Sequence, residues 1–175
     1  MNLSELGIKA RAASVLLAKM NVETKNKALI ACAEALVKES NSILEANEKD
    51  VLIGREKGMN EGLVDRLMLT EERIKGIAEG LEQVAALDDP VGEVLDMKKR
   101  PNGLLIGKKR VPLGVVGMIY EARPNVTPDA FALCFKSGNA VILRGGSDAI
   151  NSNIAIVKVL QDTLKACGIT EDAVQ

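Results

Sequence analysis

Two short apolar segments, each followed by a helical pattern, constrain the fold of this chain more than any other feature. The segments lie at 114–120 and 140–143, and an unbroken apolar run of that length is typical of a strand covered on both faces of a parallel sheet. A helical pattern separates them, and a second one follows over 151–167. The order strand, helix, strand, helix predicts a right-handed βαβ unit in an α/β fold, with a third parallel strand beginning near 173–175.

Capping residues mark the ends of both predicted helices. Thr127 is predicted to be the N-cap of the first helix, with Pro128 in its first turn, and Gly138 and Gly168 follow the two helices as αL caps. A sheet of so few strands is expected to leave the apolar face of the second helix without cover, which indicates a piece of a longer protein. That face consists of Ile154, Val157, Leu160 and Leu164.

Residues 1–90 are predicted to be helical, because apolar residues recur there at helical spacing. Three start signals are present: Ser42 with Glu45 as a capping box, Asn60 as an N-cap, and Thr70 followed by acidic residues. The predicted helices cover about 6–17, 28–37, 42–52, 60–67 and 70–84. All of them are amphipathic, so we expect their apolar faces to pack against other parts of the protein.

A two-stranded ribbon is predicted after the polar turn that ends the helical half. Segments 91–97 and 104–110 alternate like strands, and the Asn-Gly step within 100–103 accepts the positive φ of a hairpin turn. Each arm ends in a basic triplet, at 98–100 and 108–110. Such triplets can bind nucleic acid, but the net charge of -1 favours a solvated strand edge that resists aggregation.

Composition excludes several classes of function. The chain has no His, which excludes His-ligated metal sites and every Ser-His or Cys-His catalytic pair, and we expect no metal site. With one Tyr, two Phe, no Trp and no net positive charge, we expect no nucleic-acid partner. No apolar run approaches the roughly 20 residues needed to span a bilayer, so we expect no membrane partner. Three widely spaced cysteines are typical of reduced thiols and indicate a cytoplasmic protein.

Polar loops follow the two predicted strands, at the edge of the sheet where doubly wound folds bind ligands. The loop 144–147, Arg-Gly-Gly-Ser, offers a guanidinium, two residues without side chains and a hydroxyl, which suits a phosphate but also describes a plain turn. In the loop 121–125, Asn125 is either a helix-start residue or an amide donor to an oxyanion. Composition alone favours the helix-start role.

Two long segments resemble one protein family. They are 111–130, VPLGVVGMIYEARPNVTPDA, and 136–147, KSGNAVILRGGS. Both are similar to gamma-glutamyl phosphate reductases of the aldehyde dehydrogenase superfamily, and the resemblance extends over essentially the whole chain. It is specific, because the wider superfamily usually has Pro-Trp-Asn where this chain has Arg-Pro-Asn, and Lys where it has Arg144.

The resemblance implies a reaction in which NADPH reduces L-glutamyl 5-phosphate to L-glutamate 5-semialdehyde, with phosphate release, in proline biosynthesis. In that family a cysteine thiolate attacks the acyl phosphate, and the resulting thioester is reduced. The cysteine lies in a later domain, and none of Cys32, Cys134 or Cys167 stands in a matching motif. We therefore expect the catalytic domain to be absent from this chain, and the chain alone to be inactive.

The resemblance also assigns roles to individual residues. Asn125 matches the amide that stabilises the oxyanion, and Arg144 with Ser147 matches the site of the adenosine ribose, where a cation and a small hydroxyl fit the 2'-phosphate of NADP. The expected cofactor-binding residues are Ile119, Tyr120, Glu121, Arg144, Gly145, Gly146 and Ser147.

The resemblance implies an aldehyde-dehydrogenase-like fold with a Rossmann-type, three-layer cofactor domain. Residues 1–90 form its helical N-terminal part, 91–111 a protruding hairpin that serves oligomerisation, and 112–175 the start of the NADP-binding βαβα unit. We expect a homo-oligomer. The alternative is a noncatalytic module that holds a nucleotide or a partner without chemistry.

Overall fold

The parallel sheet predicted from the two apolar segments is present in the computed structural model, which describes residues 2–175. Strand β3 (Val115–Ile119) pairs in parallel with β4 (Ala140–Arg144). A parallel bridge joins Val141 to Val174, and the N–H of Gln175 donates to the carbonyl of Val141 at 3.0 Å. The third parallel segment expected near 173–175 is therefore confirmed, with β4 in the middle.

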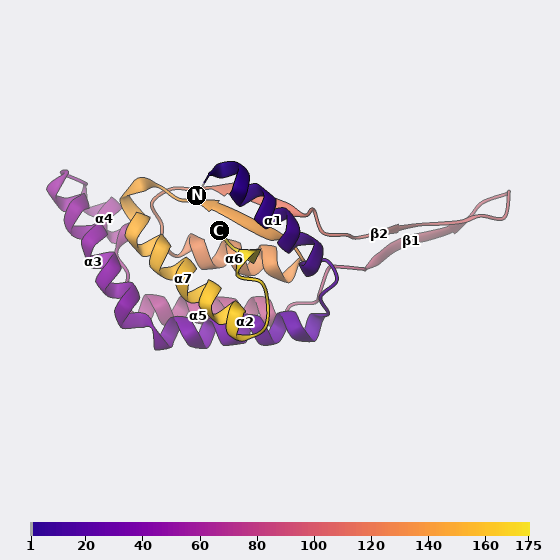
Figure 1. The fold of residues 1–175 in the computed structure, drawn as a ribbon, viewed down its shortest axis with the longest axis horizontal. Helices are drawn as coiled ribbons and strands as arrows, with labels where there is room; N and C mark the ends of the chain where they lie inside the picture. Colours follow the sequence, from indigo (N-terminus) through magenta and orange to yellow (C-terminus); the bar gives the residue numbers. More distant parts are fainter. Residues whose placement is uncertain (1) are drawn as a thin grey trace.

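Helices cover both faces of this sheet (Figure 1). Helix α1 (Leu3–Leu17) lies on one face, and α6 (Val126–Lys136) and α7 (Ile150–Ala166) lie on the other. Beneath them, α2 (Val22–Lys38) packs against α7 and against α5 (Glu71–Ala86). The α/β architecture is confirmed, and the N-terminal helices do pack against other elements, as their amphipathic patterns predicted.

Two further helices lie at the end of the molecule remote from the hairpin (Figure 1). They are α3 (Ser40–Glu56) and α4 (Glu61–Leu67). Asp50 of α3 is buried, and its carboxylate accepts the backbone N–H groups of Asn151 at 3.2 Å and Ser152 at 2.7 Å. Because the first N–H groups of a helix lack partners within it, Asp50 caps α7 from another element.

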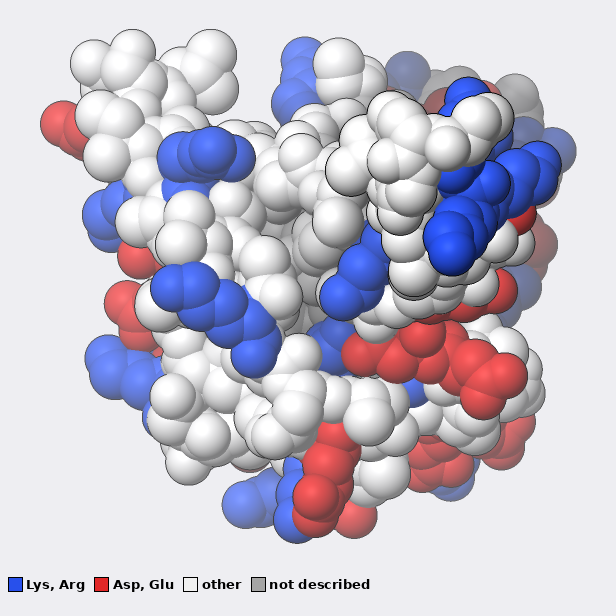
Figure 2. Space-filling view, turned by 90° about the vertical axis from the view of Figure 1, so that its right-hand side faces the viewer, with Lys and Arg blue, Asp and Glu red and all other residues white. Residues whose placement is uncertain are grey.

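The predicted hairpin is present and projects far from the rest of the molecule (Figure 1). It consists of β1 (Val94–Lys99) and β2 (Leu105–Lys109), with Gly103 at φ +85° in the turn. Two basic side chains form ion pairs within the ribbon, Lys98 with Asp96 and Arg110 with Glu93. Viewed from this end, basic and acidic side chains are interspersed with uncharged ones (Figure 2).

Two of the predicted helix starts are confirmed and one is wrong. The side chains of Asn60 and Thr70 accept the N–H groups of Leu63 and Arg73, as N-caps do. Ser42, by contrast, lies inside α3, which begins at Ser40 without a side-chain cap. Helix α3 follows α2 after a single intervening residue, so it needs no separate start signal.

Thr127 is not the N-cap of α6. The N-cap is Asn125, and Thr127 is fully buried in the first turn. Its hydroxyl lies 2.6 Å from that of Tyr120 and donates to Oδ1 of Asn153 at 2.8 Å. The hydroxyl of Thr127 therefore forms tertiary hydrogen bonds instead of the capping hydrogen bond predicted from the local sequence.

The apolar face of α7 is largely covered, contrary to the sequence prediction. Leu160 and Leu164 are fully buried, because α2 and α3 pack against α7, while Ile154 is 60% exposed. Strand β3 is also less covered than predicted, with Ile119 80% exposed. It is an edge strand in the described residues, so one of its sides lacks a neighbour.

The three cysteines are free, but only two are buried. Burial raises the pKa of Cys32 to about 12 and also raises that of Cys134. Cys167 is exposed at the C-cap of α7. The two buried thiols are held in their protonated, unreactive form.

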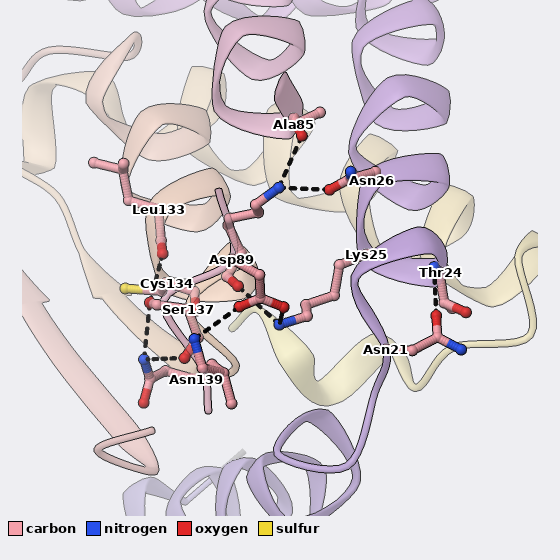
Figure 3. A network of polar contacts seen from close by, with 12 residues as sticks. Asn21, Thr24, Lys25, Asn26, Ala85, Asp89, Leu133, Cys134, Ser137 and Asn139 are labelled. Carbon is pink, nitrogen blue, oxygen red and sulfur yellow. Dashed lines mark hydrogen bonds and ion pairs between the residues drawn. The ribbon is translucent and has the colours of Figure 1, made fainter. Parts of the chain in front are cut away.

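A buried polar network joins α2, α5 and α6 at the base of the hairpin (Figure 3). The ammonium of Lys25, a fully buried residue, forms an ion pair with Asp89 and donates to the carbonyl of Lys136 at 3.1 Å. The ammonium of Lys136 donates to Oδ1 of Asn26 at 2.6 Å and to the carbonyl of Ala85 at 2.8 Å. Burial lowers the pKa of Lys136, and the nearby carboxylate of Asp89 partly opposes that shift.

Replacing Lys25 with Met is expected to lower the free energy of unfolding by about 2 kcal/mol, because the Asp89 carboxylate and a buried carbonyl lose their donor. Urea denaturation of the chain measures the change. The matched control is Lys27→Met on the same helix, where an exposed pair with Glu23 at 2.7 Å contributes less than about 0.5 kcal/mol. Equal losses for both variants would show that the buried network does not stabilise the fold.

Candidate functional site

The two polar loops that follow β3 and β4 lie against each other at the carboxyl edge of the sheet. A Cβ placed on Gly146 would lie 2.8 Å from the backbone nitrogen of Ala122, and one placed on Gly145 would lie 2.3 Å from Nδ2 of Asn153. Real Cβ atoms do not approach so closely, and because the neighbour of Gly146 is backbone, that position requires glycine. Gly146 therefore allows the two loops to pack together, while a side chain at Gly145 would displace the amide of Asn153 on α7.

A groove of about 650 Å³ opens beside the second loop. Four of the predicted cofactor-binding residues line it: Tyr120, Arg144, Gly145 and Ser147. Helix α7 supplies an apolar wall through Ile150, Ile154 and Val157, which the sequence analysis did not assign to a site. Their spacing on one helix face is the signal that could have found them. The groove combines an apolar wall with a cation and a hydroxyl at one end.

The other predicted cofactor-binding residues lie outside this groove. Glu121 and Gly146 line a neighbouring pocket of about 350 Å³, which Arg144 and Ser147 also line. Ile119 is exposed at the end of β3 and lines neither. Arg144 and Ser147 thus stand between two hollows, and both side chains are exposed.

Asn153 contributes an unpaired donor to the groove. Its residue is 7% exposed, its Oδ1 accepts from Thr127, and within residues 2–175 its Nδ2 has no hydrogen-bond partner. A buried polar group without a partner costs about 1–3 kcal/mol, so a ligand atom that accepts from it stabilises the complex. Burial of the neighbouring Tyr120 raises the pKa of that phenol and keeps it protonated.

Asn125 lies at a third hollow, of about 490 Å³, together with Arg66, Arg73, Arg123 and Asp129. Although Asn125 is the N-cap of α6, its side chain makes no capping hydrogen bond. The amide is therefore not occupied by the helix-start role that the sequence left open. Burial raises the pKa of Asp129, and a hydrogen bond with Asn125 partly opposes that shift.

Two kinds of feature are absent from the described part of the chain. In residues 2–175 no helix is long and apolar enough to cross a membrane. The same residues hold no group of three or more His, Cys, Asp or Glu side chains arranged to bind a metal ion.

Curated relatives resemble this chain over nearly its whole length. The gamma-glutamyl phosphate reductase of Caldanaerobacter subterraneus subsp. tengcongensis is 60% identical over 167 residues, which are 95% of this chain and 40% of that protein. The reductase of Lachnospira eligens is 57% identical over 173 residues, 99% of this chain and 42% of that protein. The chain thus spans about two-fifths of the length of these relatives. No model of a protein family matches the chain.

Solved structures show the same fold. The crystal structure of gamma-glutamyl phosphate reductase from Thermotoga maritima superposes with a TM-score of 0.96 at 47% identity, covering 100% of this chain and 42% of that one. An aldehyde dehydrogenase from Geobacillus thermoglucosidasius, described as acetylating, superposes with a TM-score of 0.73 at 15% identity over 97% of this chain and 35% of its own. The predicted aldehyde-dehydrogenase-like fold is confirmed.

Proposed function

We infer that this chain is part of a gamma-glutamyl phosphate reductase, and we propose that the complete protein reduces L-glutamyl 5-phosphate to L-glutamate 5-semialdehyde with NADPH, releasing phosphate. The observation that carries the proposal is 55–60% identity to relatives of that name over nearly the whole chain. In proline biosynthesis such a protein works in the cytoplasm, and we propose that it does so as a homo-oligomer whose hairpin, 91–111, contacts a partner subunit.

The groove beside the second loop suits a nicotinamide nucleotide. Its apolar wall matches a planar base, Asn153 offers an unpaired buried N–H, and Arg144 with Ser147 offers a cation and a hydroxyl to a ribose 2'-phosphate. Ile119, Tyr120 and Glu121 lead from the end of β3 toward Asn125. Gly145 and Gly146 lie in the second loop, beside the first one. When bound, the cofactor supplies a hydride.

Asn125 is the residue that we assign to the chemistry. Its side-chain amide donates to the carbonyl oxygen of the substrate as negative charge develops there. The nucleophilic thiolate must come from elsewhere, because Cys32 and Cys134 are buried. Cys167 lies at the far end of α7, a helix of 17 residues and so about 25 Å long. We therefore propose that residues 1–90 and 112–175 belong to the cofactor domain and that the catalytic domain lies outside this chain.

Formation of NADPH from L-glutamate 5-semialdehyde, phosphate and NADP tests the proposal in the reverse direction. The complete protein is expected to turn over, and the present chain alone is expected to give no NADPH, because it lacks a thiolate near Asn125. An inactive complete protein would overturn the reaction that we propose. Activity of the purified chain alone would instead place the nucleophile among its own three cysteines, and thiol labelling would identify it.

A further inference from the structure

The hollow that contains Asn125 gathers charged side chains from separate elements. Arg66 comes from α4, Arg123 from the loop after β3, and Asp129 from α6. Arg66 and Arg123 are far apart in sequence, and the fold alone brings them to one cavity of about 490 Å³. A cavity of this size that combines cations with a carboxylate suits a small zwitterionic ligand.

The arginines of this hollow differ in how firmly they are held by the protein. Arg73 is fully engaged, since its guanidinium donates to the carboxylate of Asp65 and to the carbonyls of Asp65 and Met68. Arg123 is held less firmly, because its buried Nε makes no hydrogen bond within residues 2–175 and its only ion pair there is with the exposed Glu121, at 3.5 Å. The side chain of Arg123 is 43% exposed, so the rest of its guanidinium is available to bind an anion.

Asp129 is the acidic counterpart of these cations. It follows Asn125 by one helical turn, so the two side chains share a face of α6. Both line the hollow, and none of the ion pairs formed within residues 2–175 includes Asp129. A half-buried carboxylate without a bound cation is stabilised by a ligand that brings one.

Gly76 keeps the opposite wall of the hollow open. It lies in the interior of α5, where glycine destabilises a helix by about 1 kcal/mol relative to alanine. A Cβ on Gly76 would meet nothing within 4 Å, so neither packing nor a positive φ requires glycine there. Gly76 is exposed and lines the hollow, so the backbone of α5 is accessible to a ligand at this point.

We propose that this hollow binds the amino-acid end of the substrate, with Arg123 and Arg66 contacting its α-carboxylate and Asp129 its α-ammonium. The inference rests on the proposed function. It assigns recognition of the substrate to this chain, with Asn125 at the same cavity donating to the carbonyl oxygen of the group that reacts. The ligand class is an amino acid with a reactive carbonyl at the end of its side chain.

The test compares two aldehydes in the complete protein, in the direction that forms NADPH: L-glutamate 5-semialdehyde and 5-oxopentanoate, which lacks only the α-ammonium. The wild type is expected to prefer the amino acid. Asp129→Asn is expected to lower that preference roughly tenfold by raising KM for the amino acid, while KM for 5-oxopentanoate changes little. The matched control, Glu79→Gln, removes an exposed carboxylate of α5 outside the cavity and leaves the preference unchanged.

A second variant, Arg123→Gln, tests the contact with the carboxylate, which both aldehydes carry. For this variant, KM is expected to rise roughly tenfold for both aldehydes, while KM for phosphate stays the same. A rise in KM for phosphate alone would overturn the carboxylate assignment, because the arginine would then serve the leaving group.

The outcomes separate this inference from the proposed function. If the wild-type protein does not turn over glutamate 5-semialdehyde, the proposed function fails and the inference fails with it. If the wild type is active but Asp129→Asn keeps its preference for the amino acid, only the inference is overturned.

Thermal unfolding monitors folding of the variant, and Asp129→Asn is expected to be at least as stable as the wild type at pH 7. The raised pKa of Asp129 means that ionisation costs stability in the folded state as pH rises through that pKa.

Discussion

Replacing Asn125 with Ala in the complete protein is expected to lower the turnover number about a hundredfold, with little change in the binding of NADPH. The amide stabilises negative charge that exists only in the transition state, so its loss affects kcat more than ground-state binding. Asn125 makes no capping hydrogen bond, and the substitution removes only its hydrogen bond with the partly exposed Asp129, so we expect it to lower stability by no more than about 1 kcal/mol. Steady-state kinetics and a fluorescence titration with NADPH measure the two effects.

The control for this experiment is Asn41→Ala, at an exposed position of α3 outside the hollow that holds Asn125. It should leave both quantities unchanged. Near-normal turnover of Asn125→Ala would contradict the oxyanion role and leave Asn125 as a residue that only begins α6. A parallel loss of thermal stability would instead assign its effect to folding.

Replacing Arg144 with Glu is expected to weaken NADPH binding about a hundredfold while changing NADH binding much less. The substitution sets a carboxylate against the 2'-phosphate, and a hundredfold change corresponds to about 2.7 kcal/mol. Dissociation constants for both coenzymes, measured on the complete protein by titration, give the ratio directly. The effect should shrink at high ionic strength, because Arg144 is exposed and its charge is screened.

Arg100→Glu in the hairpin is the matched control, since it makes the same charge change on an exposed basic residue remote from the groove. It should leave the preference for NADPH unchanged. Equal losses of NADPH and NADH binding by Arg144→Glu would remove Arg144 from the 2'-phosphate site. They would place the guanidinium at a part of the cofactor that both coenzymes share.

The sequence predicted the features of this protein that local backbone chemistry controls. Gly103, Gly138 and Gly168 adopt the positive φ expected of a hairpin turn and two helix ends. Asn60 and Thr70 cap helices because the partner of each side chain lies three residues away. The apolar runs predicted parallel strands because neighbouring side chains in such strands point to opposite covered faces.

Chain order also predicted part of the candidate site. Chain order alone indicated that the loops after β3 and β4 share one edge of a sheet, and the structure places Tyr120, Arg144, Gly145 and Ser147 at one groove there. It also predicted Asn125 at the end of the neighbouring loop. These residues follow strands directly, so topology fixes their positions.

Tertiary structure alone decided what depends on partners distant in sequence. Thr127 has the local signature of an N-cap, but it is buried where Tyr120 and Asn153 complete its hydrogen bonds. Leu160 and Leu164 are covered by helices from the other half of the chain, which no periodicity within α7 can reveal.

The start of α7 and the hollow beside Asn125 likewise depend on residues that are distant in sequence. Asp50, about a hundred residues before α7, supplies the cap that α7 lacks in its own sequence. Arg66 and Asp129 meet at one cavity because α6 packs against α5 and Arg73 of α5 binds Asp65 of α4, and not because of any sequence spacing between them. Local sequence determines backbone conformation through interactions among neighbours, whereas burial, pairing and cavities arise when distant segments pack, so only the folded chain determines them.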